Sequence, residues 1–63
     1  MNINDIIFAE TCKDRQGFCN VIYCDGTTDI IGSGIGELYK KLCRISDSGL
    51  YFMIGRSALI CEN

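Results

Sequence analysis

The chain has 63 residues, of which 48% are hydrophobic, and its six basic and eight acidic side chains give a net charge of −2. A chain of this length forms one domain over residues 1–63, and it buries only about 60% of the surface that its unfolded form exposes, so its own core is marginal. Phosphate binding depends on lysine and arginine, so the net negative charge excludes a protein that binds nucleic acid through a surface that is basic throughout. Nucleic-acid binding is then possible only through a local basic surface.

The first half of the chain predicts three antiparallel strands. Residues 3–11 are rich in isoleucine and phenylalanine and lead into a polar loop at 13–17, and 18–24 form a second apolar segment. The Asp25–Gly26 pair tolerates the positive φ angles of a two-residue type I′ turn. Residues 27–31 are therefore predicted to fold back as a third strand.

The second half predicts one helix and a hairpin. Apolar residues recur at helical spacing over 35–45, and the glycine-rich segment 32–36 lacks P-loop spacing, so we expect it to be a plain strand-to-helix connection. Gly55 suits the first central position of a type II′ turn between strands at 50–54 and 58–61. The predicted fold is a small α+β domain with a mostly antiparallel sheet, the order βββαββ and one amphipathic helix.

Two of the predicted strands, the second and the fourth, are apolar on both faces. Such strands are typical of a sheet covered on both sides, and a single helix covers only one side. We expect the uncovered face to bury itself in a homodimer or higher oligomer. The residues expected on that face are Cys19, Val21, Tyr23, Tyr51 and Met53.

The five cysteines are expected to be reduced, because the first residues lack the basic and long apolar regions of a signal peptide and indicate a cytoplasmic protein. The cysteines have no C-x-x-C spacing and the chain has no histidine, so we expect no metal site, no cofactor and no catalytic residues. They are predicted to serve as small apolar residues, with Cys19, Cys24 and Cys43 reacting slowly with thiol reagents.

Membrane insertion is not expected, since no apolar run reaches the ~20 residues of a membrane span. Basic side chains form three small groups, of which one lies on the helix. The other two are Lys13 with Arg15 in the first loop and Arg56 in the last hairpin turn. A solvated surface is the simplest interpretation of such groups, but their position in loops at strand ends also favours a local binding surface.

Residues 52–60, with the sequence FMIGRSALI, resemble the signature of the LytTR family of bacterial DNA-binding domains. In that signature an aromatic strand runs into a basic residue and then Arg-Ser before an aliphatic strand. Residues 5–10, 25–27 and 36–42 are similar to the family's acidic-ended strand, its hairpin turn and its helix with paired leucines. The resemblance covers about residues 5–61, in the form of a shortened and divergent member.

The resemblance implies a transcription-regulating domain that contacts duplex DNA through loops. Carried over by position, Arg56 is the recognition residue and Ser57 its neighbour. Lys13, Arg15 and Gln16 lie in the loop that contacts DNA.

An alternative function belongs to a different class. A small acidic protein of this size is also typical of the inhibitors that phages and other mobile elements encode. Such a protein would bind a bacterial target protein through an exposed strand edge or through its acidic surface.

Overall fold

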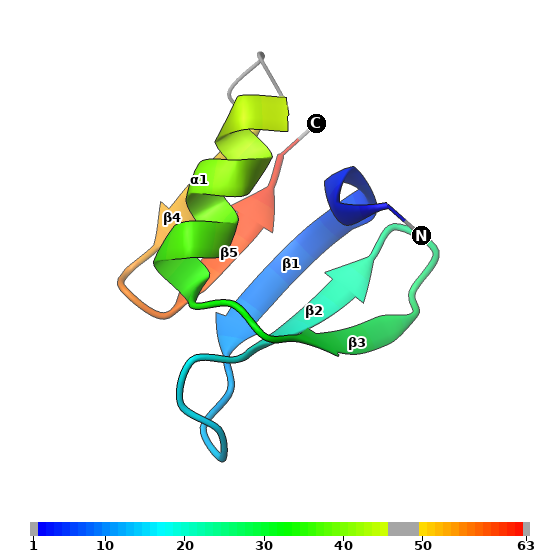
Figure 1. The fold of residues 1–63 in the computed structure, drawn as a ribbon. Helices are drawn as coiled ribbons and strands as arrows, with labels where there is room; N and C mark the ends of the chain where they lie inside the picture. The colour runs from blue at the N-terminus through cyan, green and yellow to red at the C-terminus, as the bar shows by residue number, and fades with distance from the viewer. Residues whose placement is uncertain (1, 46–49, 63) are drawn as a thin grey trace.

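The structure, a computed structural model, describes residues 2–45 and 50–62, and it has two layers (Figure 1). One layer is a five-stranded antiparallel sheet, and the other is an α-helix that packs across one face of the sheet. The predicted α+β class and the order βββαββ are confirmed. In chain order the elements are the 3-10 helix η1 (Ile3–Asp5), β1 (Ile6–Thr11), β2 (Cys19–Tyr23), β3 (Thr28–Ile31), α1 (Ile35–Ile45), β4 (Tyr51–Ile54) and β5 (Ala58–Cys61).

The sheet has the strand order β3-β2-β1-β5-β4, with β1 at its centre. The chain makes the β1-β2-β3 meander first, crosses the sheet through α1, and returns as the β4-β5 hairpin with β5 beside β1. Every pair of neighbouring strands is antiparallel. Because β5 lies beside β1, the first and last strands of the sequence are neighbours in the sheet.

A β-bulge interrupts the pairing of β1 with β2. Ile6 pairs with Tyr23 and Phe8 pairs with Ile22, so one residue of β1 lies unpaired between them. Side chains normally alternate between the two faces of a strand. The extra residue breaks that alternation, so that Ile6 and Ala9, three positions apart, both lie buried beneath α1 with 0% exposure.

The core lies between α1 and the sheet. Leu38 and Leu42, one helical turn apart, are fully buried, whereas Ile45 at the end of the same helix is 52% exposed. None of the helices in the described part of the chain has the length and apolar character that crossing a membrane requires. The buried core residues are Ile6, Ala9, Cys19, Val21, Leu38, Leu42, Tyr51 and Leu59.

The sequence-based choice of the uncovered face is wrong. Cys19, Val21 and Tyr51 are buried in the core, and Tyr23 and Met53 pack against it. These five residues face α1, and the helix leaves the opposite face of the sheet open. Both faces of β2 and β4 are apolar, so alternation alone cannot identify the face that the helix covers.

The β2–β3 turn also differs from the prediction. Gly26 has a φ of 90°, but no non-glycine residue in the described ranges has a positive φ, and a type I′ turn requires one at Asp25. The Gly26 amide instead donates to the Tyr23 carbonyl at 2.9 Å, as in a type I turn followed by a left-handed glycine. The Asp25 carboxylate accepts hydrogen bonds from the Thr27 amide (3.0 Å) and hydroxyl (2.6 Å), which lower the pKa of Asp25.

Candidate nucleic-acid interface

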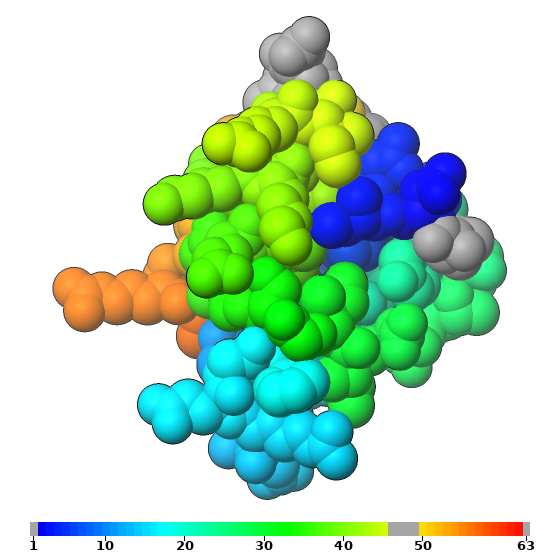
Figure 2. Space-filling view, viewed as in Figure 1, coloured from blue at the N-terminus to red at the C-terminus, as the bar shows by residue number. Residues whose placement is uncertain are grey.

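Two segments predicted to bind DNA meet at one end of the sheet. The amide of Thr11, the last residue of β1, donates a 2.7 Å hydrogen bond to the carbonyl of Ser57 in the β4–β5 turn. The β1–β2 loop follows directly, so it lies beside that turn. Side chains of both segments, cyan and orange in Figure 2, project from the surface. We call this surface the basic end; its residues, all exposed, are Lys13, Arg15, Gln16, Arg56 and Ser57.

Backbone hydrogen bonds give the β1–β2 loop a defined shape. The Cys12 amide donates to the Phe18 carbonyl at 3.0 Å, and the Phe18 amide donates to the Arg15 carbonyl at 3.4 Å. Gly17 completes the turn with a φ of 83°. The Arg15 guanidinium carbon lies 5.7 Å from the centroid of the Phe18 ring, within the range of a cation–π interaction. The loop therefore holds Arg15 near its base.

The N-terminus of α1 lies at the same end of the molecule. The Cys19 thiol donates to the Ser33 carbonyl at 3.0 Å, and a Cβ on Gly32 would lie only 3.3 Å from Cε2 of Phe18. The β3–α1 connection thus packs against the base of the β1–β2 loop. The first helical hydrogen bond, from the Leu38 amide to the Gly34 carbonyl, is 2.9 Å long. The partial positive charge of a helix N-terminus adds to the basic end.

Charges are unevenly distributed along the strand direction. Lys13, Arg15 and Arg56 lie at the basic end, where Asp14 of the same loop offsets one of them. Three acidic residues lie at the opposite end: Asp5 before β1, Asp25 in the β2–β3 turn and Glu62 after β5. At the basic end, Glu37 in the first turn of α1 offsets a second basic charge. The chain is acidic overall, and its basic loop residues are concentrated at this end.

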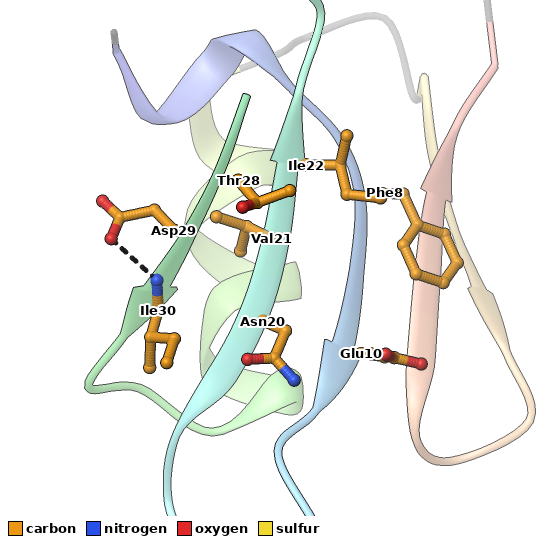
Figure 3. A pocket seen from close by; sticks show the side chains of 8 residues that line it. All are labelled: Phe8, Glu10, Asn20, Val21, Ile22, Thr28, Asp29 and Ile30. Atoms are coloured by element: carbon orange, nitrogen blue, oxygen red, sulfur yellow. Dashed lines mark hydrogen bonds between the residues drawn. The ribbon is translucent and has the colours of Figure 1, made fainter. Parts of the chain in front are cut away.

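Sequence reasoning missed a hollow on the face of the sheet opposite α1. The hollow has a volume of about 600 Å³ and lies over β1, β2 and β3 (Figure 3). The lining residues are Phe8, Glu10, Asn20, Val21, Ile22, Thr28, Asp29 and Ile30, and none of them is basic. Val21 and Asp29 pair with each other on the α1 face, where Val21 is fully buried, so the other six residues supply the side chains of the face opposite α1. These six alternate along β1, β2 and β3, which was the available signal, but only the strand order shows that the three strands adjoin.

The cysteines differ in exposure more than predicted. Cys19 is fully buried and Cys43 is half-buried, but Cys24 is exposed just after β2, so the prediction of a shielded Cys24 is wrong. Burial raises the pKa of the Cys19 thiol, and the neighbouring Cys12 raises it further.

Thiol labelling under native conditions should separate these sites. Cys24 should react at a rate near that of an unfolded peptide, whereas Cys19 should react only through opening of the fold. Mass spectrometry of peptides after timed labelling measures both rates, and denatured protein provides the reference. Equal protection of Cys24 and Cys19 would contradict this placement of Cys24.

The described residues offer little for metal chemistry. No three cysteine, aspartate or glutamate side chains among residues 2–45 and 50–62 lie close enough together to hold a metal ion. No protein-family model, curated protein or solved structure matches this chain.

Proposed function

We propose that the chain is a small DNA-binding domain that contacts duplex DNA through its basic end. The observation that carries the proposal is the meeting of the β1–β2 loop and the β4–β5 turn, two segments about 40 residues apart in sequence, at one end of the sheet. These are the two segments to which the LytTR resemblance assigns DNA contacts. The N-terminus of α1 at the same end supports an anionic ligand.

The basic side chains suit different tasks. Arg56 occupies the tip of a hairpin, where a planar guanidinium can form two hydrogen bonds with a guanine edge or a phosphate. Lys13 and Arg15 flank it from the β1–β2 loop and would hold the phosphate backbone. Three phosphate contacts would make the affinity fall about 40-fold between 50 and 200 mM salt.

The alternative, an inhibitor that adds itself to a partner's sheet, has weaker support at the β3 edge than at the uncharged β4 edge. The Asp29 carboxylate accepts a 2.8 Å hydrogen bond from the Ile30 amide at this edge. The bond occupies a backbone donor that an added strand needs, and the carboxylate places a charge on the edge. Both features are typical of edges that avoid strand addition.

Replacing Arg56 by alanine tests the proposal. We expect the variant to bind duplex DNA more weakly by about 1 to 3 kcal/mol if Arg56 makes a bidentate base contact. Fluorescence anisotropy with labelled random and mixed-sequence duplexes, over a salt series starting at low salt, measures the loss. Arg44→Ala is the matched control, because Arg44 is exposed in the last turn of α1, away from the basic end.

Two results would contradict the proposal. One is the absence of binding by the wild-type chain at the lowest salt concentration. The other is an equal loss of affinity in Arg56→Ala and Arg44→Ala when circular dichroism shows that both are folded.

A further inference from the structure

The face of the sheet opposite α1, which we call the open face, is organised in two rows that cross all five strands. Residues that pair across antiparallel strands place their side chains on the same face, so the strand register defines each row. In sheet order from β3 to β4, the first row is Thr28, Ile22, Phe8, Ile60 and Phe52, and the second is Ile30, Asn20, Glu10, Ala58 and Ile54.

The two halves of the open face differ. Over β4 and β5, Phe52, Ile54 and Ile60 are 48%, 50% and 40% exposed, and we call this apolar group the ridge. Over β1, β2 and β3 lies the hollow of about 600 Å³. Figure 3 shows that Phe8 and Glu10 lean toward β5, away from the part of the hollow over β2 and β3. Ridge and hollow thus lie on opposite sides of the central strand.

We propose that two copies of the chain pack open face to open face about a two-fold axis parallel to β1. This axis exchanges the two sides of the central strand, so β4 of each copy lies over β3 of the other. Phe52 then faces the partner's Thr28, and Ile54 faces the partner's Ile30. Each ridge enters the hollow of the other copy, and one set of residues is buried twice. The hollow has ample volume for two apolar side chains.

The available area is close to what a stable dimer requires. A standard interface buries about 800 Å² on each partner, less than a fifth of the 4356 Å² accessible surface of this chain. The two longest dimensions of the chain, 31 and 23 Å, limit a flat sheet face to about 700 Å² before the relief of its side chains is counted. Packed sheets lie about 10 Å apart, a separation that interdigitated phenylalanine and isoleucine side chains fill.

Glu10 distinguishes a second copy from other occupants. It lies on the central strand, so the proposed axis places the two Glu10 side chains in the same interface, one on each side of the axis. Like charges held together in an interface weaken it. Glu10→Gln should therefore strengthen self-association. A basic partner protein in the same hollow would instead lose an attractive charge in this variant.

Sedimentation equilibrium from micromolar to millimolar concentration tests the proposal. The wild type should convert with concentration to a species of twice the 7.0 kDa chain mass. Phe52→Asp and Ile30→Asp, one in the ridge and one in the hollow, should each raise the dissociation constant at least about 30-fold. Glu10→Gln should lower it about tenfold. Ile45→Asp is the control, because Ile45 is 52% exposed on α1, outside the open face.

Three outcomes would overturn the proposal. The first is a monomer at every concentration, and the second is an equal effect of Ile45→Asp on the dissociation constant. The third is weaker association of Glu10→Gln, which would show that the two Glu10 side chains do not repel each other across this interface. Circular dichroism of each variant separates dissociation from unfolding. If an aspartate variant unfolds, Glu10→Gln still tests the proposal, because it is expected to strengthen association.

Discussion

Leu38→Ala is expected to lower the free energy of unfolding by about 2 to 5 kcal/mol. Leu38 is fully buried between α1 and the sheet, and its removal leaves a cavity that surrounding side chains fill only in part. A 63-residue domain has a total stability of about 3 to 9 kcal/mol, so the substitution removes a large share of it. Urea denaturation followed by circular dichroism gives the difference between variant and wild type.

Ile45→Ala is the matched control for this substitution. It also truncates an aliphatic residue of α1. Because Ile45 is half exposed, this substitution should change the free energy of unfolding by less than about 1 kcal/mol. Equal losses in the two variants would mean that α1 does not pack through Leu38.

Alkaline pH is expected to destabilise the protein through Tyr51. The Tyr51 hydroxyl donates to the carbonyls of Asn4 and Ile6, each at 3.0 Å, and the side chain is only 4% exposed. Burial, with a contribution from the neighbouring Cys61, raises the pKa of Tyr51 to about 12. Ionisation in the folded protein would remove the one hydroxyl hydrogen that these two hydrogen bonds share.

The sign of the pH effect follows from the direction of the shift. The folded pKa lies above the ordinary value of 10.0, so the stabilisation is complete below pH 10 and is lost as pH rises from 10 to 12. The two-unit difference corresponds to about 2 to 3 kcal/mol. Urea denaturation at intervals between pH 8 and 12 should show this loss.

Two phenylalanine variants isolate the contribution of Tyr51. Tyr51→Phe should be less stable at neutral pH by about 1 to 3 kcal/mol, because it leaves buried carbonyls without a donor, and it should lack this alkaline step. Tyr23→Phe removes a tyrosine elsewhere in the sheet and should keep the step. An alkaline loss of the same size in Tyr51→Phe would assign the effect to other groups.

Local patterns in the sequence were sufficient to predict most of the elements. The helical spacing of apolar residues predicted α1 at 35–45, its observed bounds. The predicted strand at 58–61 also has its observed bounds, and Gly55 in the turn before it has a positive φ, 62°. These features depend on interactions between residues close in sequence.

The identity of the open face required information that no local pattern contains. The β-bulge in β1 places Ile6 and Ala9 on one face, which regular alternation forbids. In β2 and β4 both faces are apolar, so the position of α1 decides which of them is buried. The prediction of the wrong face followed from the second property, because all five predicted residues lie in β2 and β4.

The residues of the basic end could be predicted from the sequence, but their proximity could not. The sequence indicates that Lys13, Arg15 and Arg56 lie in loops at strand ends. It does not indicate that those loops share an end, because that depends on β5 pairing with β1 across a separation of about 50 residues. A long-range strand pairing of this kind is a property of the whole fold.

The strand order leaves the sheet with two unequal edges, and this difference bears on aggregation. At one edge, β3 carries Asp29, whereas at the other edge β4 has the sequence Tyr-Phe-Met-Ile with no charged residue. An uncharged, apolar edge strand is a template on which further chains can add and grow into fibrils. The four-residue length of β4 limits this growth. A charge introduced at the exposed Ile54 would place a gatekeeper on this edge, and it would also weaken the proposed contact of Ile54 with Ile30 of the second copy.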